Sequence, residues 1–148
     1  MAAALGLGVT AWSPLAGGVL TGKQLEPGGA KDSRQAHEAM QQFTKSDARK
    51  EAIAREVVAV ARESGHSPAQ VALAWLRQRP GPVIPIIGAR KLAQVKDNLA
   101  CLEVKLTPTQ IDRLDAVSKI ELGFPLDMLS KEMVRSLSSG GMRDQIDA

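Results

Sequence analysis

Two short apolar runs and four longer amphipathic segments hold most of the hydrophobic positions in this chain. The runs GVTAWS at 8–13 and VIPII at 83–87 are each closed by a turn residue, which predicts two strands. Pro85 has no N–H to donate to a sheet, so the second strand is expected to end near it or to form an irregular rim.

Apolar residues that recur every three or four positions predict the helices. The first helix begins near Ser46 and ends at Gly65, because glycine is typical of the position after a helix. SPAQ at 67–70 and TPTQ at 107–110 match the capping box and predict two further helix starts. The predicted buried faces are Ile53, Val57, Val60 and Ala61; Val71, Ala72, Trp75 and Leu76; Leu92, Val95 and Leu99; and Ile111, Leu114 and Val117.

The order of these elements predicts the fold class. Each strand is followed by helix, which is typical of an α/β protein with parallel strands. Two apolar parallel strands do not form a stable sheet alone, because such sheets are covered on both faces. Further strands are therefore expected to complete the sheet, and its open edges are candidates for homo- or hetero-association. We interpret residues 1–148 as one domain portion in which 124–148 form a flexible tail.

Length and composition narrow the class of protein. With 148 residues, 44% hydrophobic and 24% charged, the chain is typical of one soluble globular domain. The net charge of +3 is mild and basic residues alternate with acids, which argues against nucleic acid binding. The single cysteine, Cys101, excludes an internal disulfide and is expected to be a buried apolar residue. The start of the chain lacks a signal-peptide pattern and no run reaches membrane-span length, so we expect a cytoplasmic protein.

The first candidate site is WSPLAGGVLTGK at 12–23, directly after a strand. Its small residues let the backbone approach an anion, and Ser13 and Lys23 can donate hydrogen bonds to one. An ordinary glycine-rich loop would have the same composition. The segment is not a P-loop, because it lacks the required glycine spacing and a Ser or Thr after the lysine.

The second candidate site is GARKLAQVKDN at 88–98. A glycine and an arginine at a helix start suit a phosphate, and Gln94 and Asn98 follow Arg90 on one predicted face, opposite the apolar stripe. Any surface helix has such a polar row, so a purely structural interpretation stays open. Both segments follow the C-terminal ends of predicted strands. In a (β/α)8 barrel the active face lies at those ends, and the loops after the last two strands often bind a phosphate. His37 and His66 are interpreted as solvated or capping residues, and no metal site is predicted.

Four stretches resemble the C-terminal half of an aldo-keto reductase: GVTAWSPLAGGVLTGK, SPAQVALAWLRQRPGPVIPIIGARKLAQVKDNL, LTPTQIDRLD and LGFPLDML. The branch that contains bacterial reductases and potassium-channel β subunits is the most similar. The resemblance implies a partial (β/α)8 TIM barrel, with 8–13 as its seventh strand and 83–87 as its eighth. It also implies NADP(H) as cofactor and the NADPH-dependent reduction of aldehydes and ketones to alcohols.

The resemblance also implies a role for each candidate residue. Arg90 would pair with the ribose 2′-phosphate, since its guanidinium is planar and permanently charged, which favours NADP over NAD. The path from nicotinamide to pyrophosphate would be lined by Trp12, Ser13, Leu15, Ala16 and Gly17. The loop over the pyrophosphate would add Lys23 and Arg34. The adenosine-phosphate site would comprise Gly88, Arg90, Gln94, Asp97 and Asn98.

The catalytic residues of the family have no match in this chain. The family uses an Asp, a Tyr, a Lys and a His from the first half of the barrel, and this sequence contains no tyrosine. We therefore predict no catalytic residue here, and a carbonyl substrate only if an N-terminal half complements the chain. Two alternatives stay open: a non-catalytic module that binds a nucleotide or a protein, and a truncated product without independent function.

Overall fold

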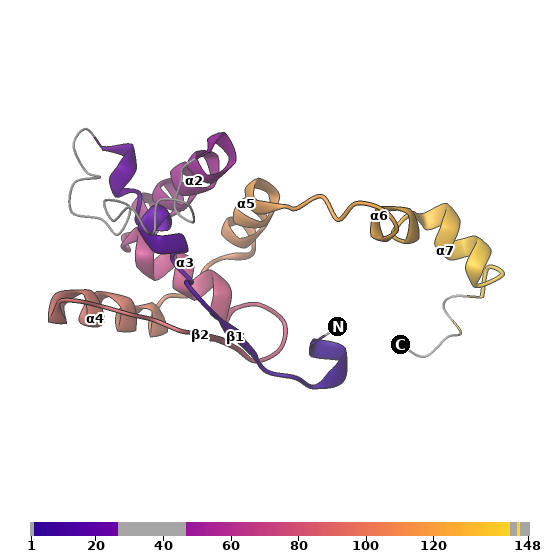
Figure 1. The fold of residues 1–148 in the computed structure, drawn as a ribbon, viewed down its shortest axis with the longest axis horizontal. Helices are drawn as coiled ribbons and strands as arrows, with labels where there is room; N and C mark the ends of the chain where they lie inside the picture. The colour runs from indigo at the N-terminus through magenta and orange to yellow at the C-terminus, as the bar shows by residue number, and fades with distance from the viewer. Residues whose placement is uncertain (1, 27–46, 143–144, 146–148) are drawn as a thin grey trace. The chain divides into compact units, whose positions relative to one another are not determined.

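The computed structural model describes residues 2–26, 47–142 and 145, and it divides into two compact units, 1–118 and 119–148 (Figure 1). The first unit carries the sheet and most of the helical residues. Its elements are the 3-10 helices η1 (Ala3–Leu5), η2 (Ala16–Thr21), η3 (Lys23–Leu25) and η6 (Ala100–Leu102), the strands β1 (Val9–Ala11) and β2 (Val83–Pro85), and the helices α2 (Ala48–Ser64), α3 (Pro68–Arg77), α4 (Leu92–Leu99) and α5 (Pro108–Ser118).

The two predicted strands are confirmed, and they pair in parallel. Val9 lies opposite Val83 and Ala11 lies opposite Pro85. Both strands are shorter than predicted. The first ends before Ser13, whose φ of 53° turns the chain out of the extended conformation, and the second ends at Pro85 as its missing N–H led us to expect. Within the described residues these two strands are the whole sheet.

The predicted helix boundaries are confirmed at three starts. Asp47 caps α2 by accepting a hydrogen bond from the Lys50 N–H at 2.8 Å. Ser67 and Gln70 form a complete capping box at the start of α3. At the start of α5, Thr107 Oγ1 accepts from the Gln110 N–H at 3.3 Å, and Gln110 Oε1 accepts from the Thr107 N–H at 2.9 Å. The two capping boxes are local in sequence, which is why the pattern of residues predicted them, whereas the cap by Asp47 was not predicted.

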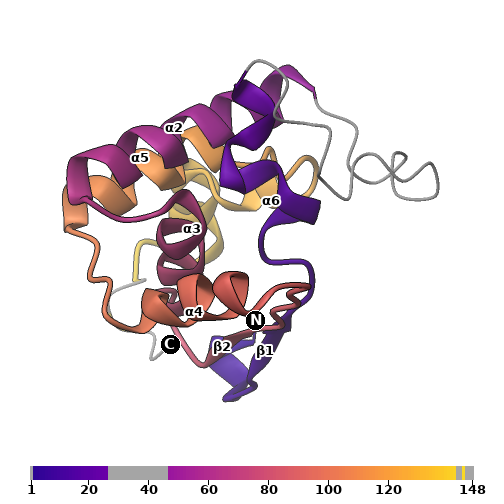
Figure 2. The same cartoon turned by 90° about the vertical axis from the view of Figure 1, so that its left-hand side faces the viewer.

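The hydrophobic core lies among α2, α3 and α5, which pack together (Figure 2). Leu73 in α3 is 1% exposed, and Trp75 and Ile111 are half-buried against the cluster. Arg113 of α5 reaches α2, where it donates to Glu56 at 2.7 Å and to Glu63 at 2.6 Å. The buried core cluster comprises Val57, Val60, Ala61, Val71, Ala72, Ala74, Val104, Leu106 and Leu114.

The prediction for the buried face of α4 was wrong. Leu92 is 70% exposed and Leu99 is 49% exposed, whereas Asn98 is only 5% exposed. The helix contacts α3, and it does so through a polar side chain, because the Asp97 carboxylate accepts hydrogen bonds at the start of α3. Those bonds turn the apolar stripe outward.

The second unit contains two short helices, α6 (Leu126–Leu129) and α7 (Glu132–Ser138). The Asp127 carboxylate accepts from the Gly123 N–H at 2.9 Å, just before α6. Neither helix buries a residue. The expectation of a flexible tail from residue 124 stays a prediction.

Candidate functional site

The C-terminal ends of β1 and β2 lie side by side, because the strands are parallel neighbours in register. The Ile86 N–H donates to the Ala11 carbonyl at 2.9 Å, so the two strands stay paired as far as Ala11, directly before Trp12. Both candidate segments, 12–23 and 88–98, therefore leave the sheet at the same edge. In open and closed α/β sheets this edge is where ligands bind.

The segment after β1 is tightly folded on itself. Ser13 and Ala16 have φ values of 53° and 50°, a region that side chains with a Cβ rarely adopt. Ser13 Oγ accepts from the Gly17 N–H at 3.2 Å, and the Ser13 carbonyl accepts from the Ala16 N–H at 2.8 Å. Leu15 packs against the core and anchors this turn. Trp12 is 75% exposed at the strand end.

The start of α4 is organised by Gln94. Its Oε1 accepts from the backbone N–H of Arg90 at 2.9 Å and of Lys91 at 3.2 Å. Two N–H groups that precede the helix are thus satisfied by a side chain from its own first turn. Gly88 and Arg90 are exposed where the chain enters the helix. The predicted face is only partly correct: Arg90 is exposed and Gln94 half-buried, while Asn98 turns inward.

Asp97 and Asn98 are adjacent in sequence but differ in their environment. Asp97 accepts from Ser67 Oγ at 3.0 Å and from Gln70 Nε2 at 2.7 Å. Its carboxylate therefore fixes α4 against the capped end of α3. The Asn98 side chain has no hydrogen-bond partner in the part of the chain that the structure describes, although the residue is 5% exposed. Arg79 Nε is the one buried polar side-chain atom without a partner among the described residues, so the Asn98 amide keeps some contact with solvent.

The other candidate residues lie apart from these two segments or outside the description. Lys23 is exposed in η3. Arg34 and His37 lie outside the described residues. Cys101 is 6% exposed in η6, and burial raises the pKa of its thiol, so it remains protonated at neutral pH. Among residues 2–26, 47–142 and 145, no group of three metal-ligating side chains comes together.

Two polar arrangements were missed by sequence analysis. The capping box of α3 was predicted, but its second use, as a donor pair for Asp97, depends on where α4 docks. The indole N–H of Trp75 donates to Asp115 at 2.7 Å, Arg79 pairs with the same carboxylate at 2.9 Å, and the Arg79 guanidinium carbon lies 4.4 Å from the Trp75 ring centroid. Asp115 lies 40 positions from Trp75 and 36 from Arg79, so no local motif signals that it joins them.

The fold is that of an α/β protein whose two parallel strands end at one edge, the place where ligands bind in sheets of this class. The sequence profile of the aldo/keto reductase family matches residues 1–119, and the chain belongs to this family.

Individual relatives agree with this assignment. A rice (Oryza sativa subsp. japonica) protein named "Probable voltage-gated potassium channel subunit beta" is 38% identical over 116 residues, which are 76% of this chain and 35% of that protein. A Saccharomyces cerevisiae protein, "Putative aryl-alcohol dehydrogenase YFL057C", is 28% identical over 136 residues, 89% of this chain and 87% of its own length. "Uncharacterized oxidoreductase YrpG" of Bacillus subtilis is 34% identical over 102 residues, which are 69% of this chain and 29% of that protein. The chain thus spans about a third of the rice and bacterial relatives and most of the yeast one.

None of the helices in the described ranges is both long enough and apolar enough to cross a membrane.

Proposed function

We propose that this chain is the NADP(H)-binding portion of an aldo/keto reductase that reduces aldehydes or ketones. The observation that carries the proposal is the meeting of the two candidate segments at one sheet edge, after Ala11 and after Pro85. Family membership supplies the oxidoreductase class, and the relative named as an aryl-alcohol dehydrogenase supports a carbonyl–alcohol interconversion. In this proposal the chain forms the last two strands of a (β/α)8 barrel.

The polar groups near the start of α4 fit the adenosine end of NADP(H). Arg90 would hold the 2′-phosphate by a bidentate, charge-assisted pair. The Asn98 side chain has no hydrogen-bond partner among the described residues, and its amide would offer both a donor and an acceptor to an adenine edge. Asp97 would act as a positioning residue, because its carboxylate already joins α4 to Ser67 and Gln70.

The turn after β1 fits the other end of the cofactor. Ala16 and Gly17 are held in a narrow loop by Ser13, so their backbone can approach a ligand without a bulky side chain between them. Lys23 and Arg34 would add positive charge for the pyrophosphate, as the family resemblance implies. Trp12, with most of its surface exposed, would present an apolar ring beside the nicotinamide.

The bound cofactor would supply a hydride to the carbonyl carbon of the substrate. This chain's own residues would bind and orient that cofactor, and they would not protonate the alkoxide. Reduction requires a proton donor near the carbonyl oxygen, and the sequence has no tyrosine to fill the family's acid role. We therefore expect no turnover from this chain without the strands that carry the catalytic residues.

Those further strands are the proposed partner of the sheet. Ile84 is 58% exposed and Ile86 is 50% exposed beside Trp12, and apolar strand faces of this kind are covered in stable α/β proteins. The covering strands would come from a further part of the polypeptide or from a separate chain. We also propose that the protein acts on small carbonyl compounds, and that it does so in the cytoplasm, which suits its family.

Titration of the chain with NADPH, followed by cofactor fluorescence, tests the proposal. We expect saturable binding of NADPH, weaker binding of NADH, and at least about a tenfold loss of NADPH affinity in Arg90→Gln, because a charge-assisted pair is lost. Lys96→Gln is the matched control, since it removes one exposed positive charge from the same helix.

Equal affinity for NADPH and NADH, or equal losses in the two variants, would contradict the assignment of Arg90. If the folded chain binds neither nucleotide, the cofactor proposal fails for the isolated chain. Sedimentation without nucleotide then decides whether it is an association module: stable self-association through the sheet would support that alternative, which the exposed faces of β1 and β2 favour.

A further inference from the structure

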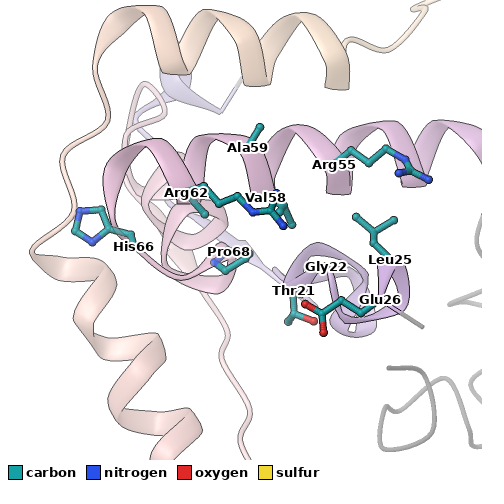
Figure 3. A pocket seen from close by; sticks show the side chains of 11 residues that line it. Thr21, Gly22, Leu25, Glu26, Arg55, Val58, Ala59, Arg62, His66 and Pro68 are labelled. Atoms are coloured by element: carbon teal, nitrogen blue, oxygen red, sulfur yellow. The ribbon is translucent and has the colours of Figure 1, made fainter. Parts of the chain in front are cut away.

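A pocket of about 520 Å³ lies between α2 and the segment that contains η2 and η3 (Figure 3). Its volume is in the range of small-molecule sites. The start of α3 closes one end at Pro68. Among the described residues, none of those assigned to the cofactor lines this pocket, although Lys23 lies in η3 between the lining residues Gly22 and Leu25.

The floor of the pocket is apolar and closely fitted. Val58 of α2 and Leu25 of η3 contribute apolar side chains to its lining, and Ala59 of α2 also lines it. Gly22 approaches α2 so closely that a Cβ at this position would collide with Val58 Cγ2, and its φ of +73° also excludes most side chains. The two walls are therefore held at a separation that a glycine alone permits.

The charges on the two walls are asymmetric. Arg55 and Arg62 lie on one face of α2, seven residues and therefore about 10 Å apart along the helix axis. Arg55 lies 3.8 Å from Glu51, whereas Arg62 has no ion pair within the described parts of the chain. Glu26 lines the opposite wall, and it is not within ion-pair distance of Arg62.

The directions of the side chains distinguish the two arginines. In Figure 3 the Arg62 side chain runs along α2 toward Val58, while Arg55 points toward the other end of the helix. The His66 ring points away from the other labelled side chains in the same view. Arg62 is thus the cation placed over the apolar floor.

We propose that this pocket binds a small organic anion, a carboxylate or phosphate ester whose charged group pairs with Arg62 and whose apolar body lies on Val58 and Leu25. The guanidinium provides a planar fork for either anion. The carboxylate of Glu26 restricts the site to anions small enough to stay on the α2 side of the pocket. The pocket borders the candidate segment 12–23 through Thr21 and Gly22, but Arg62 is not one of the residues assigned to the cofactor, so Arg62→Gln and Arg90→Gln test the two proposals independently.

Two-dimensional ¹H–¹⁵N NMR titrations of the full chain with benzoate, phenyl phosphate and inorganic phosphate test this site. Benzoate and phenyl phosphate are expected to shift the amides of Thr21, Gly22, Val58 and Ala59 with millimolar affinity. The stronger of the two identifies the preferred anion. Inorganic phosphate, which has no apolar body, is expected to bind more weakly than phenyl phosphate.

Three variants make the test specific. Arg62→Gln should weaken binding about three- to fivefold, the range for an exposed charge pair, and Glu26→Gln should strengthen it about twofold by removing the opposing charge. Lys105→Gln removes one positive charge from an exposed position that does not line the pocket, and it should leave the affinity unchanged.

The proposal is overturned if Arg62→Gln and Lys105→Gln weaken binding equally, or if the shifts are spread over the chain rather than confined to the pocket. It is also overturned if inorganic phosphate binds as tightly as phenyl phosphate, because the apolar floor would then contribute nothing. Glu26→Gln keeps the test decisive if Arg62→Gln does not fold, since unchanged affinity in that variant contradicts a charge-selective pocket.

Discussion

The helices of the first unit bury their apolar side chains more completely than its two-stranded sheet does. In α3, Val71 is 0% exposed and Leu73 is 1% exposed, and Val71 belongs to a buried cluster that also contains side chains of α2 and α5. In β2, Ile84 is 58% exposed, although isoleucine is typical of the buried face of a strand. The helices therefore form a core of their own, whereas the sheet has apolar residues that nothing in the first unit covers.

The hydrogen bonds of polar side chains also differ between the helices and the sheet. Around the helices, Asp115, Asp97 and Arg113 each bridge two elements by hydrogen bonds. At the sheet edge, the described hydrogen bonds of Ser13 and Gln94 are local, as when Gln94 accepts from the backbone N–H of Arg90. A region that is ordered but not covered is suited to receive a ligand or further strands.

The largest expected difference between the two regions is in the cost of truncating an apolar side chain. Leu73→Ala is expected to lower the free energy of unfolding by about 2–5 kcal/mol, because it leaves a cavity in the core. Ile84→Ala is expected to cost less than about 0.5 kcal/mol, because the side chain is already largely exposed. Urea unfolding followed by circular dichroism measures both. Equal costs would mean that the sheet is covered in solution, for example by self-association.

A smaller effect is expected from the cluster around Asp115. The hydrogen bond from Arg79, with a further one from Trp75, lowers the pKa of the Asp115 carboxyl below its ordinary value near 3.8. The folded state therefore binds this proton less readily than the unfolded state does, so the stabilisation is present above pH 3.8 and is lost as the pH falls through the folded-state pKa.

Asp115→Asn tests this cluster. The variant is expected to lose about 1 kcal/mol at pH 7, a modest value because the Asp115 side chain is 41% exposed and its charge is screened by water. Between pH 5 and pH 3 its urea midpoint should fall less than that of the wild type. An unchanged acid slope would show that Asp115 and Arg79 are not paired in solution.

The smallest comparison concerns the two capping boxes. Ser67→Ala and Thr107→Ala should each cost about 1 kcal/mol, the usual value of an N-cap hydroxyl. Ser67→Ala should cost a few tenths of a kcal/mol more, because Ser67 also donates to Asp97 and thereby holds α4. Differential scanning calorimetry of the two variants measures the difference. A smaller loss in Ser67→Ala than in Thr107→Ala would mean that the contact with Asp97 does not contribute to docking of α4.

Much of the fold could be predicted from the sequence, and the reason is that the signals were local. Gly65, Ser67 and Thr107 mark helix ends by bonds within four or five residues of themselves. Pro85 marked the end of β2 because it has no N–H. The parallel pairing followed from the order of strand and helix. The candidate cofactor residues rest on this framework and on the family resemblance, and binding measurements will test them.

The residues that could not be predicted are those whose neighbours are distant in sequence. Periodicity assigned Leu92 and Leu99 to a buried face and Asn98 to an exposed one, and packing reversed both. The sequence establishes where helices and strands begin and end, because capping, turn and strand signals act over a few residues. Tertiary structure alone decided which side of α4 faces α3 and which charged side chains line the pocket beside α2. These outcomes depend on hydrogen bonds and contacts between elements, whose energies no single segment contains.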